Sequence, residues 1–132
     1  MSDGIAATGR ERVLGWLVAA IALHSLGIAA VLLFAPDWGV RLGGFAALQP
    51  RFFARQAGAF HVVVAVAYLY EWSRYRGVTL LLITKCLAVV FLVTAPWFEP
   101  VPWPIPVSAA GDALMAALVW ALRRSARGSG RA

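Results

Sequence analysis

The stretch that decides the fold reads VLGWLVAAIALHSLGIAAVLLF and runs from Val13 to Phe34. Only His24 and Ser25 interrupt its apolar character. A helix needs roughly 20 predominantly apolar residues to cross a bilayer, so this stretch is long enough to span one. It is also much longer than the ~7–15 apolar residues of a cleaved signal peptide. We therefore interpret it as a retained membrane helix.

Three further apolar stretches follow, so that four spans are expected at residues 13–34, 50–72, 78–98 and 105–122. The composition agrees, because 61% of the 132 residues are hydrophobic and 14% are charged. A soluble domain of this size cannot hide that much apolar surface, and a disordered chain would have more charge. We predict one all-α domain, an integral membrane four-helix bundle, with a basic cytoplasmic tail at residues 123–132 that is expected to be frayed from Ser125 onward.

The arginines predict the orientation of these spans. Loops rich in Lys and Arg stay preferentially in the cytoplasm. With the N-terminus inside, eight arginines fall on the cytoplasmic side and three on the outer side, and the six tryptophans divide equally between the two interfaces. We expect a multi-pass protein of the bacterial inner membrane with both termini in the cytoplasm. The net charge of +6 then reflects topology and lipid headgroups, and no nucleic acid partner is expected.

Two connections on the outer side have recognisable local signals. Residues 35–49 are apolar and glycine-rich, which suits a short interfacial helix or a re-entrant turn with Asp37 as a possible N-cap. Residues 100–106 have proline at every second position, so they are not expected to be helical throughout. They favour a stiff, extended connector.

Each expected span contains one polar side chain at a similar depth. On helix rise alone, His24 lies about 17 Å from the cytoplasmic end of its span, His61 about 16 Å, Asp112 about 15 Å and Lys85 about 11 Å. An ionised side chain facing lipid costs about 2.5–3.5 kcal/mol or more. We therefore expect Lys85 to pair with Asp112 on the neighbouring helix, with Arg55 as the rival partner of Asp112.

These side chains predict a polar core inside the membrane. On the first span the inward stripe is expected to consist of Leu17, Ala20, His24, Gly27 and Val31, because small residues beside a polar one allow close helix packing. Two interpretations stay open, a functional site and a structural ion pair with hydrogen-bonded histidines. The residues of the predicted core are His24, His61, Lys85, Asp112 and Arg55.

Three functions are compatible with this pattern. The first is an accessory or scaffold role beside other membrane subunits or as a homo-oligomer, which is favoured over catalysis because the sequence has no nucleophile–base set, phosphate loop or paired carboxylates. The second is a redox role, linked to quinone or to a b-type haem held by His24 and His61, with Gly27 and Gly58 making room. The third is proton-coupled transport of a small molecule by an oligomer. No metal site is expected.

Short motifs suggest a family. Arg55-Gln56-Ala57-Gly58 opens the second span, Lys85 lies in the third, and Gly111-Asp112 lies in the fourth. In these features the chain resembles small four-span bacterial membrane proteins of unknown function, the DoxX-like group. The resemblance covers the second to fourth spans and has no counterpart of His24. It implies a four-span fold and an inner-membrane location, and it assigns no catalytic residues.

Overall fold

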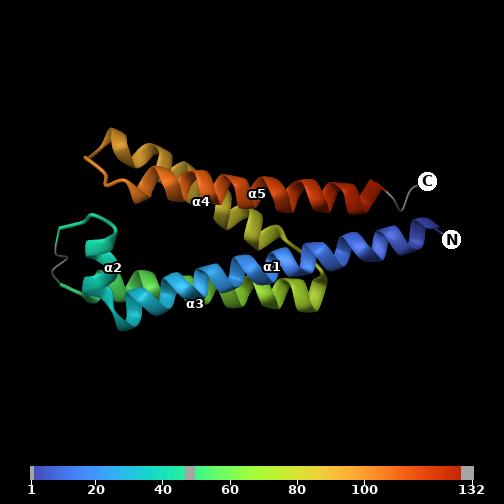
Figure 1. Ribbon diagram of the computed structural model, residues 1–132, viewed down its shortest axis with the longest axis horizontal. Coiled ribbons are helices and arrows are strands. Elements are labelled where there is room, and N and C mark those ends of the chain that lie inside the picture. The colour runs from blue at the N-terminus through green and yellow to red at the C-terminus, as the bar shows by residue number, and fades with distance from the viewer. Residues whose placement is uncertain (1, 47–49, 129–132) are drawn as a thin grey trace.

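The computed structural model describes residues 2–46 and 50–128, and its regular elements there are all helices (Figure 1). Four helices are long and apolar enough to cross a membrane. The all-α prediction and the four long apolar helices, packed as a bundle, are confirmed. The elements are α1 (Ser2–Phe34), α2 (Pro36–Leu42), α3 (Phe52–Tyr75), α4 (Thr79–Thr94), a 3₁₀ turn η1 (Ala95–Trp97) and α5 (Pro104–Gly128).

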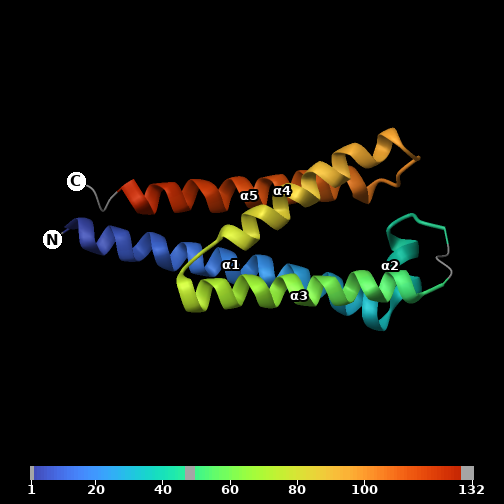
Figure 2. The ribbon, with the colours of Figure 1, turned by 180° about the vertical axis from the view of Figure 1, so that it is seen from behind.

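The long helices form two antiparallel pairs, α1 with α3 and α4 with α5 (Figures 1 and 2). The start of α1 and the end of α5 lie at the same end of the bundle, as an even number of spans requires. The two pairs meet at this end, where α1 contacts α5 and α3 contacts α4. Toward α2 they diverge, because α4 crosses obliquely from the end of α3 to the far end of α5.

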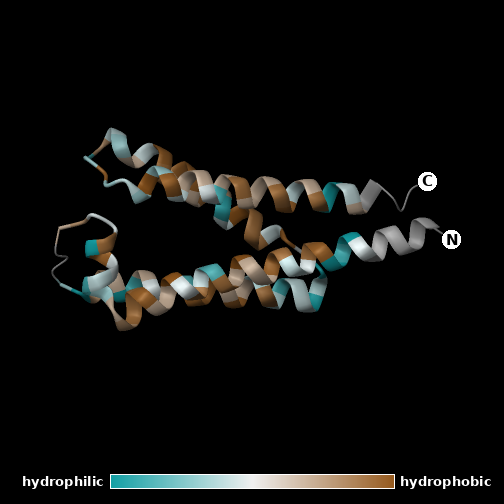
Figure 3. Cartoon of the chain, in the orientation of Figure 1, coloured by the Kyte–Doolittle hydropathy of each residue, from teal (hydrophilic) through white to brown (hydrophobic). Residues whose placement is uncertain are grey.

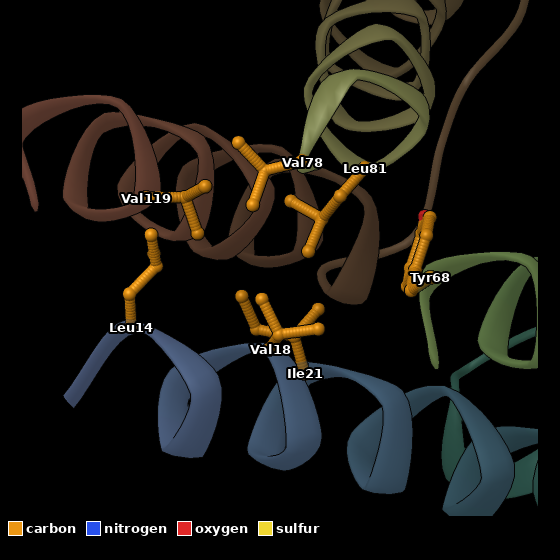
Figure 4. Packing of buried hydrophobic residues seen from close by; sticks show 7 residues of the cluster. All are labelled: Leu14, Val18, Ile21, Tyr68, Val78, Leu81 and Val119. Carbon is orange, nitrogen blue, oxygen red and sulfur yellow. The ribbon is translucent and has the colours of Figure 1, made fainter. Parts of the chain in front are cut away.

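An apolar core joins the two helix pairs (Figure 4). Side chains of α1 face side chains of all three other long helices. Each is almost fully buried, and in lipid such packing stabilises the bundle through van der Waals contacts. The cluster consists of Leu14, Val18 and Ile21 of α1, Tyr68 of α3, Leu81 of α4, Val119 of α5, and Val78, which precedes α4.

The outward surface of the bundle carries many large apolar side chains. Large side chains such as Phe34 (86% exposed) and Trp97 (77% exposed) point away from the chain. Hydropathy colouring shows apolar residues along the middle of the helices and hydrophilic ones mostly toward their ends (Figure 3). Soluble monomers rarely expose contiguous apolar surface on this scale. The chain is therefore a multi-pass membrane protein in contact with lipid.

Helices α1 and α3 pack closely along their length through small residues. A Cβ atom added at Gly58 would lie 2.9 Å from Leu33 Cγ, 3.1 Å from Leu32 Cβ and 3.2 Å from the carbonyl oxygen of Ala29. Only the absence of a side chain at Gly58 allows this approach. Small residues at such contacts are typical of membrane helices, whose association relies on van der Waals packing.

The inward stripe predicted for the first span is wrong in part, although Leu17 of that stripe packs against the apolar core. Ala20, His24 and Gly27 are exposed in the isolated chain. The residues of α1 that are buried lie on a neighbouring face, which includes Val18 and Ser25. A helix that is apolar on all sides gives no periodic signal for the face that packs, because lipid and core favour the same side chains.

The connections differ from their predictions in detail. Helix α2 is the expected short helix, but Ala35 is its N-cap and Asp37 lies in its first turn instead. There Asp37 accepts a hydrogen bond of 3.1 Å from Nε of Arg51 and lies 2.8 Å from its Nη2. The proline-rich connector is non-helical only before Pro104, since α5 begins with that proline, whose missing N–H is tolerated in a first turn.

The expected fraying of the tail from Ser125 onward is also wrong in part. Helix α5 continues to Gly128. Residues 129–132 of the predicted tail lie outside the described residues.

Candidate functional site

A cavity of about 600 Å³ lies between the two helix pairs and receives residues from all four long helices. Its apolar wall includes Phe91, Leu92 and Met115. Its polar lining consists of His24 and Ser25 from α1, His61 from α3, Lys85 from α4, and Ser108 and Asp112 from α5. Four of these six residues belong to the five predicted for the polar core.

Lys85 and Asp112 form an ion pair at this cavity. The Nζ atom of Lys85 lies 2.5 Å from Oδ1 of Asp112. The two side chains are 8% and 16% exposed. Because the helices are antiparallel neighbours, residues at matching depth on α4 and α5 face one another. The pairing offsets the cost of placing each charge in the membrane, and the remaining exposure of Asp112 leaves the pair in contact with the cavity.

His61 is held in one tautomer by its own helix. Its Nδ1 lies 2.8 Å from the carbonyl oxygen of Ala57, one turn earlier in α3. A carbonyl oxygen only accepts hydrogen bonds, so the ring proton sits on Nδ1 and the lone pair is on Nε2. The half-buried imidazole therefore presents a hydrogen-bond acceptor to surrounding groups.

His24 and Ser25 approach the cavity from adjacent positions of α1. Ser25 is buried, whereas His24 is exposed in the isolated chain. Sequence reasoning missed Ser25, because a serine inside an apolar helix commonly bonds to its own backbone and gives no signal of its orientation. In the sequence, only the neighbouring His24 indicated that this part of α1 approaches a polar site.

Arg55 does not belong to this group. It is exposed near the beginning of α3 and does not line the cavity. Its predicted place in a buried core, and its rival pairing with Asp112, are therefore wrong. Lys85 takes that place because it projects from the helix that packs directly on α5.

The two histidines do not fit the haem hypothesis. They line the same cavity from α1 and α3, which pack against each other in this region at Gly58 and Ala29. Axial ligands must bind iron from opposite faces of one porphyrin plane, and helices in such close contact have no space for a macrocycle between them. Gly58, expected to make room, does not, since its space is filled by α1, and the open space beside Gly27 lies toward α2 and not toward His61.

Within the described residues no three His, Cys, Asp or Glu side chains come together in a group that could hold a metal ion. Compared with family models, with curated proteins and with solved structures, the chain matches none. The site combines an ion pair, two imidazoles and two serines with the apolar walls of one cavity.

Proposed function

We propose that this chain is an accessory protein of the bacterial inner membrane, with both termini in the cytoplasm, whose cavity binds a small lipid-soluble molecule. The observation that supports a ligand is the position of the Lys85–Asp112 pair at a cavity of about 600 Å³. A purely structural ion pair needs no such space. This volume lies within the ~300–1,000 Å³ typical of small-molecule sites.

The lining indicates the chemistry of the ligand. Apolar walls formed by Phe91 and Leu92 suit a hydrocarbon body. Lys85 has N–H groups beyond the one directed to Asp112, and His61 presents an acceptor at Nε2. An amphiphile with a small uncharged head that both donates and accepts hydrogen bonds would satisfy them, whereas a second full charge would compete with the ion pair.

The test is extraction of the purified protein with organic solvent, followed by mass spectrometry of the extract. We expect a lipid-soluble compound at a fixed ratio to wild-type protein and its loss from Gly111→Leu. Gly111 lines the cavity and has no atom within 4 Å of an added Cβ, so the leucine would occupy ligand space without a clash at its Cβ.

Gly27→Leu is the matched control, because Gly27 also has open space beside it and does not line this cavity. It should retain the compound. Equal loss from both variants, or an extract containing only bulk phospholipid, would contradict a ligand and leave a scaffold role. The accessory part of the proposal predicts co-purification with a larger membrane complex at fixed stoichiometry.

A second candidate is proton-coupled transport of a small molecule by an oligomer. It is favoured by one observation, the presence of four titratable side chains around a single cavity. Asp112→Asn would remove the carboxylate that such a relay needs. Substrate flux into proteoliposomes should then stop, and flux that persists in this variant would exclude the mechanism. The resemblance to the DoxX-like group supports the four-span inner-membrane arrangement only.

A further inference from the structure

A second pocket, of about 510 Å³, lies where the α3–α4 connection meets α5. Its lining differs chemically from that of the intramembrane cavity, because it combines basic and aromatic side chains. One side is formed by residues around the connection and the other by the last turns of α5. The polar and aromatic lining residues are Glu71, Tyr75, Thr79, Trp120, Arg123 and Arg124.

The Glu71 carboxylate in this pocket already accepts hydrogen bonds from the backbone of α4. One oxygen of Glu71 accepts a hydrogen bond of 2.9 Å from the N–H of Thr79, and the other accepts one of 2.8 Å from the N–H of Leu80. Glu71 thereby caps the first turn of α4, where the helix dipole favours a negative charge. Both of its oxygens are thus directed at the backbone of α4 and not at the arginines.

The two arginines have no carboxylate partner within the described part of the chain. Arg123 is half-buried. The guanidinium of Arg124 lies 5.3 Å from the centre of the Trp120 ring, a cation–π contact that holds the group in place. A stacked guanidinium still has its N–H groups in the ring plane for hydrogen bonding. Two guanidinium groups beside one carboxylate whose oxygens are bonded to the backbone favour an anion, and the planar fork of a guanidinium suits the oxygens of a phosphate.

The position of the pocket favours a lipid over a soluble anion. Val78 and Leu82 lie beside the arginines and give the pocket an apolar side. Tryptophan is enriched at the boundary between headgroups and hydrocarbon, which places Trp120 at that level. A ligand at this height has its charged group among the arginines and an apolar part along the helices. We propose that this pocket binds the phosphate of an anionic phospholipid headgroup.

The test is native mass spectrometry of the full-length protein released from nanodiscs made of phosphatidylglycerol and phosphatidylcholine. Wild-type protein should retain phosphatidylglycerol in preference to phosphatidylcholine. The double variant Arg123→Gln with Arg124→Gln should retain it about tenfold less, since hydrogen bonds to charged groups are lost. Replacing both arginines by lysine keeps the charge but not the planar fork, so retention should be intermediate.

The matched control is Arg12→Gln with Arg74→Gln, which removes the same charge from the same end of the bundle but outside the pocket. It should keep the lipid within about twofold of wild type, because exposed charges contribute little each. Equal loss in the control would overturn the proposal in favour of diffuse surface attraction. Displacement of the lipid by excess inorganic phosphate would overturn it in favour of a soluble phosphate ligand.

Discussion

Lys85 of α4 and Asp112 of α5 form an ion pair whose Nζ–Oδ1 distance is 2.5 Å, and both side chains are largely removed from the surface. The ion pair connects α4 with α5 and lies at the cavity between these two helices and the α1–α3 pair. Removing one partner leaves an uncompensated charge, which costs about 3–5 kcal/mol in buried sites, whereas replacing both is often neutral. The relationship between the two residues is therefore testable through their coupling.

Lys85→Met should destabilise the protein more than Lys85→Met combined with Asp112→Leu. The single change leaves the Asp112 carboxylate unpaired, and the double change removes both charges from the apolar surroundings. Thermal unfolding in one detergent, for the wild type, both single variants and the double variant, gives the coupling free energy. If the effects of the two single changes simply add, the residues are not energetic partners.

Gly58→Ala should destabilise the protein, because the added methyl group meets α1 at 2.9–3.2 Å and the two helices must separate. Overpacking of this kind costs about 1–3 kcal/mol. Gly27→Ala is the control, since nothing lies within 4 Å of its added Cβ. It should leave the unfolding temperature unchanged or raise it slightly through helix propensity. Similar losses in both variants would mean that α1 and α3 are not packed as described.

The sequence predicted the ion pair more reliably than the packing faces, because an unpaired charge in lipid has a high free-energy cost. Pairing lowers this cost for both Lys85 and Asp112, so their contact could be expected. His24 carries no such penalty when neutral, so nothing in its surroundings fixed the face it occupies. Arg55, near the beginning of α3, reaches the surface without crossing to Asp112. Charged residues deep in a span were thus informative, whereas a neutral imidazole and a charged residue near the end of a span were not.

Glu71 was not identified from the sequence, because its partners belong to the backbone of the next helix. Glu71→Gln should lower the free energy of unfolding by about 1–3 kcal/mol, since an amide supplies only one acceptor oxygen for the two N–H groups and loses the charge. Glu99→Gln is the matched control in the exposed α4–α5 connection. Chemical unfolding of both variants in detergent tests this, and an equal effect of the two changes would argue against a capping role.

Cysteine labelling tests the arrangement of the four helices in the membrane. Cys86 lies exposed on α4, so Cys86→Ser first removes the background. Single cysteines are then introduced at Ser73, near the end of α3, and at Glu99, between α4 and α5. The orientation favoured by the arginines requires a membrane-impermeant maleimide added to whole cells to label Glu99→Cys and to spare Ser73→Cys. The reverse pattern would invert the bundle while keeping its four spans. Labelling of both positions from outside would be incompatible with α4 crossing the bilayer, since the two sites lie at opposite ends of that helix.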